Sequence, residues 1–79
     1  MTDPQIVDRL RRKQIRYMKI EELQTLFSIL AAEFTAAEQP SPRMWEKLIR
    51  LHRALTVHKL ERRIDELPEL PRWPTERRR

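Results

Sequence analysis

The sequence predicts an all-α fold, a small three-helix bundle followed by an extended proline-rich C-terminal tail. The 79 residues include no glycine and no asparagine, which supply most of the positive-φ positions that tight β-hairpin turns need. Good helix formers, chiefly Leu, Glu, Arg, Lys, Gln and Ala, dominate the composition. Apolar residues also recur at helical spacing along three segments, which predicts helices at about 4–18, 20–38 and 42–67.

The composition excludes most kinds of catalytic and metal site. Without cysteine there are no disulfides or thiolate metal ligands. Without glycine there are no phosphate-binding loops, dinucleotide fingerprints or EF-hand loops. His52 and His58 are six residues apart, so on one helix they point in different directions and cannot share a metal ion. We therefore predict a protein that is not an enzyme, with no catalytic residues, no metal, no cofactor and no small-molecule substrate.

The chain divides into a helical domain at residues 1–67 and a Pro/Arg tail at residues 68–79, whose end we expect to be disordered. A domain this small buries only about 60–65% of its unfolded surface, so self-association would add stability. The N-terminus lacks a signal pattern, and no apolar run approaches the roughly 18 residues of a membrane span. The sequence predicts a soluble, cytoplasmic protein.

The first predicted helix separates apolar from basic side chains. Asp3-Pro4 offers a favourable start, an N-cap acceptor followed by proline. Five cations share one side of this helix within an arc of about 120°: Arg9, Arg12, Lys13, Arg16 and Lys19. Such a stripe can lie along a phosphate backbone or against an acidic partner. The alternative is a solvated helix face that binds nothing.

The second predicted helix carries a continuous apolar stripe from Ile20 to Ala37. Its acids Glu21 and Glu22 suit a first turn, although no capping side chain precedes them. The stripe also continues the phase of the first helix. One long helix and two helices with a bend near Arg16–Lys19 therefore both remain open, and we favour the bend.

The third predicted helix has apolar residues on two different faces. Ser41-Pro42 caps its start, and Glu46 and Arg50 are spaced for an i,i+4 ion pair. The first face, typical of a core helix, comprises Trp45, Leu48, Leu51 and Leu55. The second face continues into the tail, and we predict it as a partner or dimer surface: Val57, Leu60, Ile64, Leu67 and Trp73. Alternatively, the N-terminal helix covers the second face within the monomer.

The tail has prolines at 68, 71 and 74, the three-residue period of polyproline II. Basic residues do not stand where the common SH3 ligands require them. We therefore predict an extended segment whose Leu70 and Trp73 dock on the bundle.

Several short landmarks of the chain are Arg-Leu-Arg-Arg at 9–12, Ile-Glu-Glu-Leu at 20–23, His52-Arg53, Lys59-Leu60 and a late proline before Trp73. With these it loosely resembles the Hha/YmoA family of small helical nucleoid-associated co-regulators. The alignment needs several gaps, and Arg50-Leu51 stand where the family has Ala-Ala-Asp. The resemblance implies action through binding to a larger DNA-binding silencer.

The net charge of +5 favours a polyanionic or acidic partner. We predict a small regulatory or accessory protein that acts by binding at a nucleic-acid-associated complex through the basic helix. No helix-turn-helix spacing is present, so any nucleic-acid contact should be weakly sequence-specific. One alternative is a phage- or plasmid-type inhibitor or adaptor that binds and blocks a host protein. Another is an Hha-like co-regulator. In each case a second protein, either another copy or a host target, is the expected partner.

Overall fold

The structure, a computed structural model, describes residues 4–72. It confirms the predicted small all-α bundle, and within the described residues there is no strand. The elements are α1 (Pro4–Arg12), a single 3-10 turn η1 (Ile15–Tyr17), α2 (Ile20–Ala36) and α3 (Pro42–Leu60). None of these helices is both long and apolar enough to cross a membrane.

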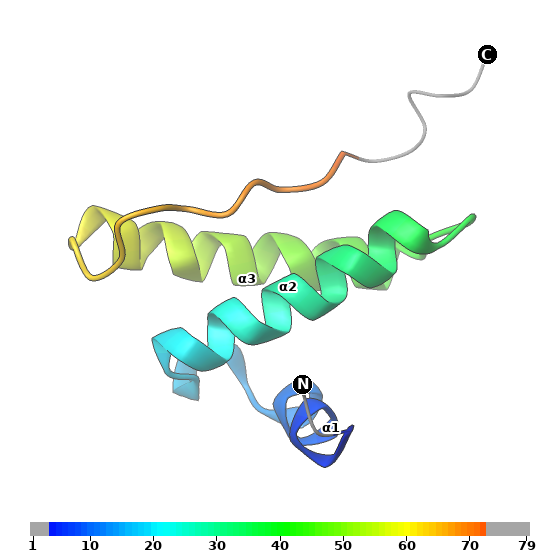
Figure 1. Ribbon diagram of the computed structural model, residues 1–79, viewed down its shortest axis with the longest axis horizontal. Coiled ribbons are helices and arrows are strands. Elements are labelled where there is room, and N and C mark those ends of the chain that lie inside the picture. Colours follow the sequence, from blue (N-terminus) through cyan, green and yellow to red (C-terminus); the bar gives the residue numbers. More distant parts are fainter. Residues whose placement is uncertain (1–3, 73–79) are drawn as a thin grey trace.

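The antiparallel pair α2 and α3 forms the centre of the molecule (Figure 1). A short loop containing Pro40 joins them, and the Ser41 hydroxyl accepts a hydrogen bond of 3.2 Å from the backbone N–H of Met44. This is the predicted N-cap. It satisfies one of the amides that a helix start leaves without a partner.

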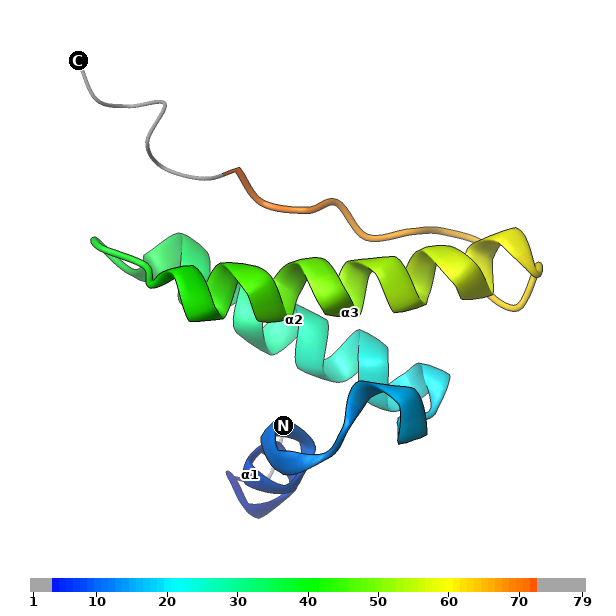
Figure 2. The same cartoon turned by 180° about the vertical axis from the view of Figure 1, so that it is seen from behind.

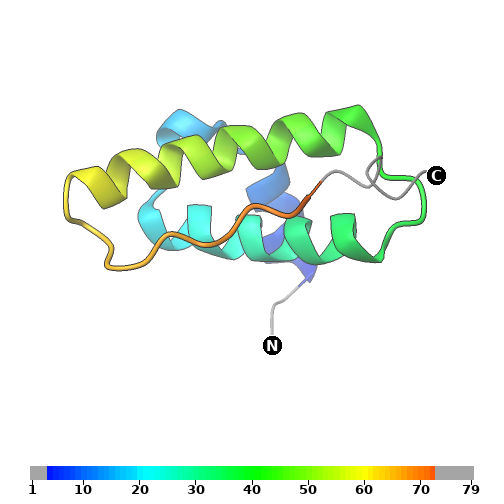
Figure 3. The same ribbon diagram turned by 90° about the horizontal axis from the view of Figure 1, so that it is seen from above.

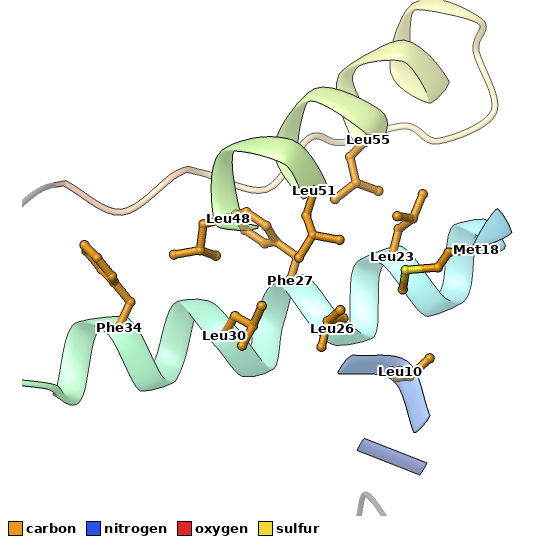
Figure 4. Close-up of a cluster of buried hydrophobic side chains, with 10 residues drawn as sticks. All are labelled: Leu10, Met18, Leu23, Leu26, Phe27, Leu30, Phe34, Leu48, Leu51 and Leu55. Carbon is orange, nitrogen blue, oxygen red and sulfur yellow. The ribbon is translucent and has the colours of Figure 1, made fainter. Parts of the chain in front are cut away.

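The core lies between α2 and α3, where leucine and phenylalanine side chains from the two helices point toward one another (Figure 4). The most deeply buried side chains are Leu23, Leu26, Leu48, Leu51 and Leu55. The first apolar face predicted for the third helix is therefore a core face, with Trp45 at its edge beside Phe34 (ring centroids 5.3 Å apart).

Two further segments cover opposite sides of this pair, as the view in Figure 3 shows. On one side, α1 and η1 contribute the buried side chains Leu10 and Met18. On the other side, residues 61–72, which we call the strap, run back along α3. Leu67 and Leu70 of the strap pack against the core.

The first helix ends at Arg12 and does not reach residue 18 as predicted. The chain then passes through η1 before it turns into α2 (Figure 2), with extended backbone at Gln14 (ψ 139°) and Met18 (ψ 142°). The favoured break is present, but it is longer than the bend expected near Arg16–Lys19. A continuous helix would carry residues 13–19 straight past the bundle. The break instead allows η1 to contact α3 while Leu10 and Met18 both reach the core.

The start of α2 lacks a capping hydroxyl or carboxylate at Lys19, so Glu22 supplies the polar contact. Its carboxylate accepts a hydrogen bond of 2.8 Å from the backbone N–H of Lys19. The helix ends at Ala36, two residues before the predicted position 38.

The prediction that the third helix continues to Leu67 is wrong, because α3 ends at Leu60. The cause is Arg62, which adopts a positive φ of 62°. The amide of Arg62 bonds to the carbonyl of Lys59 at 2.9 Å, and that of Arg63 to the carbonyl of His58 at 2.8 Å. These two bonds form a Schellman motif, which usually has glycine at the positive-φ position. The sequence shows no such glycine, so packing of the strap on the core determines where α3 ends.

Candidate functional site

The structure separates the five cations of the predicted basic stripe, because α1 ends before the last three of them. Arg9 and Arg12 lie exposed on α1, where Arg12 pairs with Asp8 at 3.1 Å. Lys13 lies after the helix, and Lys19 is the N-cap of α2. The five residues therefore do not share one helix face.

Lys13 is used within the fold. Its ammonium lies 3.0 and 3.1 Å from the two carboxylate oxygens of Glu22. The backbone N–H of Lys19 and then the Lys13 ammonium stabilise the ionised carboxylate, and together they lower the pKa of Glu22. Arg11 similarly pairs with Glu33 of α2. These contacts hold α1 and the following turn against α2.

Arg16 faces α3 instead. The side of η1 and the middle of α3 enclose an open depression of about 600 Å³, lined by Gln14, Ile15, Arg16, Arg50, Arg53 and Ala54. We call it the arginine depression. Ile15 and Ala54 contribute apolar surface to its lining, and Arg16, Arg50 and Arg53 contribute three cations. Its lining comes from two segments, and Arg16 is more than thirty residues from Arg50 in the sequence, so the depression forms only where η1 packs beside α3.

The charges of the arginine depression are not neutralised within the described chain. Among residues 4–72, no carboxylate forms an ion pair with Arg16, Arg50 or Arg53. In the described part of the chain, the ion pair for which Glu46 and Arg50 are spaced is not formed. Arg16 is oriented by two neutral neighbours: its Nε donates to Gln14 at 3.1 Å, and its guanidinium carbon lies 5.1 Å from the ring centroid of Tyr17.

A second depression of about 460 Å³ follows the same helix toward its start, lined by Arg11, Leu30, Arg43, Met44 and Lys47. Together the two depressions define a basic face, which we take as Arg16, Arg43, Lys47, Arg50 and Arg53. At 1.5 Å per residue, its cations on α3 extend over about 15 Å. The sequence signal for this face is the spacing 43, 47, 50, 53, which the stronger apolar pattern of the same helix obscured.

The residues of the predicted partner face lie in different surroundings. Val57 and Leu60, at the end of α3, are 51% and 78% exposed. Ile64 and Leu67 belong to the strap and pack against the core. Trp73 lies outside the described residues, as does the end of the tail for which disorder was expected.

The two histidines lie in different surroundings. The Nε2 atom of His52 lies 3.0 Å from the carbonyl oxygen of Pro68, and the Nδ1 atom of His58 is buried without a hydrogen-bond partner in the described chain. Over residues 4–72 no group of three His, Asp or Glu side chains is placed to hold a metal ion.

Comparison with known proteins returned no match: no family model, no curated protein and no solved structure is significantly similar to this chain. The resemblance to the Hha/YmoA family therefore rests on the short landmarks in the sequence.

Proposed function

We propose that this protein is a non-enzymatic binding protein that contacts nucleic-acid phosphates through the basic face, as an accessory or regulatory component of a nucleic-acid-associated complex. The observation that carries the proposal is the arginine depression. Arg16, Arg50 and Arg53, from two separate elements, surround one open surface and have no carboxylate partner within the described chain.

The guanidinium groups of the basic face are well suited to bind phosphate groups, and their spread along α3 matches a row of phosphates. A guanidinium group donates two parallel hydrogen bonds to phosphate oxygens. Double-stranded DNA carries one charge per about 1.7 Å of its axis, so a face about 15 Å long meets several phosphates at once. The apolar surface of Ile15 and Ala54 suits contact with the sugar rings between the phosphates.

The same geometry argues for weak sequence specificity. The cations lie on the flank of a helix that is packed on α2 over its opposite side, so α3 is not free to enter a groove as an isolated recognition helix. Contacts with phosphates position a protein on the duplex without reading its bases.

The test measures affinity for a generic duplex DNA and a generic RNA at two salt concentrations. We expect affinity to fall as salt rises. We also expect the double charge reversal Arg50→Glu with Arg53→Glu to weaken binding at least tenfold, because each phosphate contact is lost and replaced by repulsion.

A matched control is the double reversal Arg9→Glu with Arg12→Glu, which changes net charge equally on the exposed side of α1. It should weaken binding much less. Equal losses in the two variants would mean that net charge alone attracts the nucleic acid. Circular dichroism must show both variants to be folded before their affinities are compared. Absence of binding by the unaltered protein at low salt would reject the function.

A second candidate function, an inhibitor or adaptor that docks on a host protein, is favoured by the exposure of Val57 and Leu60. Large apolar side chains exposed together are typical of docking surfaces. Val57→Gln with Leu60→Gln would then abolish capture of a protein from nuclease-treated host extract. The Arg50 and Arg53 reversal would leave that capture intact, which separates the two functions.

A further inference from the structure

We infer that residues 68–72 exchange between two copies of this chain, through straightening of α3 at Arg62. In the exchanged dimer α3 continues to Leu67, and the following segment of each copy takes the place of the same segment against α2 and α3 of the other. The exchanged segment lies on the strap side of the bundle, on the opposite side from η1. Val57 and Leu60 of the dimer surface follow Arg50 and Arg53 along one face of α3, so the dimer surface borders the basic face.

The hinge is the first observation. Arg62 holds a positive φ of 62°, a conformation that glycine adopts readily and that is unfavourable for residues with a Cβ atom. Residues 61–67, Glu-Arg-Arg-Ile-Asp-Glu-Leu, are otherwise a helix-forming sequence without proline or glycine. The local sequence therefore favours a straight helix, and only the docking of the strap opposes it.

The attachment of the strap is the second observation. Two hydrogen bonds help to hold it: His52 Nε2 to the Pro68 carbonyl at 3.0 Å and Lys59 Nζ to the Asp65 carbonyl at 2.9 Å. Its leucines at 67 and 70 are only half-buried, and they lie three residues apart, as polyproline II requires for side chains on one edge. Residues 68–72 of another copy can repeat the contacts of Pro68 and Leu70, whereas Leu67 moves into the extended helix.

We take the partner to be a second copy, because straightening of α3 exposes two surfaces and a second copy of this chain complements both of them. One is the surface of α2 and α3 that residues 68–72 leave. The other is a continuous apolar stripe on the extended helix, formed by Val57, Leu60, Ile64 and Leu67 at helical spacing. Val57 and Leu60 are already exposed in the closed form. A two-fold pair buries stripe against stripe and places residues 68–72 of each copy against α2 and α3 of the other.

The charges around the stripe are compatible with such a pair. Three cations and three acids are interspersed along this part of the chain: Lys59, Glu61, Arg62, Arg63, Asp65 and Glu66. Two antiparallel copies therefore bring opposite charges together as readily as like charges, so electrostatic repulsion does not oppose the dimer.

Disulfide trapping tests the exchange cleanly, because the natural chain has no cysteine. Ser28 lines the depression beneath the strap together with Pro68, and Glu69 follows Pro68 directly. One chain carries Ser28→Cys and a second chain carries Glu69→Cys, and the two are mixed at increasing protein concentration before oxidation. A chain with both substitutions, at low concentration, is the control that reports the closed form through an internal disulfide.

Exchange predicts that the mixed disulfide exceeds the share expected from random collision and grows with concentration. Arg62→Gly should lower the association constant of the dimer by about tenfold per copy, because glycine adopts the positive φ readily and disfavours the straight helix. Arg62→Ala removes the same charge, but alanine, like arginine, disfavours the positive φ and favours the straight helix. It should therefore leave the association constant unchanged. A random share of mixed disulfide, a monomer at every concentration, or equal effects of the two Arg62 variants would each overturn the inference.

Discussion

The Nε2 atom of His52 lies 3.0 Å from the carbonyl oxygen of Pro68, which joins the middle of α3 to the strap. The same imidazole packs against Phe27 of α2, with ring centroids 5.8 Å apart. One side chain therefore contacts α2 and the strap from α3. In the sequence His52 is recognisable only as a residue at the edge of the core face.

His52→Phe keeps a ring against Phe27 but removes the hydrogen bond to the strap. We expect the strap to be weakened by about 1 kcal/mol, the usual net contribution of such a bond. Tryptic cleavage after Arg63, followed by mass spectrometry, should then accelerate about fivefold, because cleavage of a local opening follows its population. His58→Phe is the matched control, since within residues 4–72 the buried Nδ1 of His58 has no hydrogen-bond partner to lose. Equal acceleration in both variants would show that the hydrogen bond does not hold the strap.

Glu22 should make folding stability depend on pH in the acid range. Its folded-state pKa is lowered below the ordinary 4.5, chiefly by the backbone N–H of Lys19 and next by Lys13. Between those two pKa values the unfolded chain binds more protons, so stability is present above 4.5 and is lost as the pH falls through the folded value. Denaturant titrations should show that Glu22→Gln is less stable than the natural protein at neutral pH and that the difference disappears in acid.

The neighbouring Glu21→Gln is the control, because Glu21 makes no ion pair with Lys13 in the described chain. NMR titration gives a second reading. Lys13→Met should raise the Glu22 pKa only part of the way, since the hydrogen bond from the Lys19 backbone remains. A full return to the ordinary value would mean that Lys13 is the main cause of the shift.

Glutamine substitutions along the predicted second face should separate exposed from packed positions. Leu60 is 78% exposed, so Leu60→Gln should change the free energy of unfolding by less than about 0.5 kcal/mol. Ile64 packs against the core from the strap, and Ile64→Gln should cost about 1–2 kcal/mol. Urea denaturation followed by circular dichroism measures both. Equal costs at the two positions would contradict the division of this face between solvent and core.

Arg62→Gly should stabilise the monomer by about 0.5–1 kcal/mol, because glycine accepts the positive φ that ends α3. The strain relieved in the folded state exceeds the entropic cost that glycine adds by making the unfolded chain more flexible. Arg63→Gly offers the comparison, since no positive φ occurs at that position and only the entropic cost remains. Thermal denaturation of both variants at low protein concentration measures the difference. Destabilisation by both would show that the Schellman geometry is not a source of strain.

Residue patterns in the sequence predict the basic character of the candidate site but not which cations come together. The sequence places many cations on helices, and the basic character of the surface follows from that alone. The stripe on residues 9–19 required an unbroken helix, and the break after Arg12 removes that condition. Arg16 instead joins Arg50 and Arg53 because η1 packs on α3. No local pattern specifies which distant segments meet.

The sequence by itself determined the all-α class, the start of α3 at Ser41-Pro42, the proline loop before it and the core face of Leu48, Leu51 and Leu55. Each depends on local chemistry: helix propensity, capping, a missing backbone donor and helical periodicity. Tertiary structure alone decided where α1 and α3 end. At both places the local sequence permits a longer helix, but burying Met18 on one side and Leu67 on the other outweighs it.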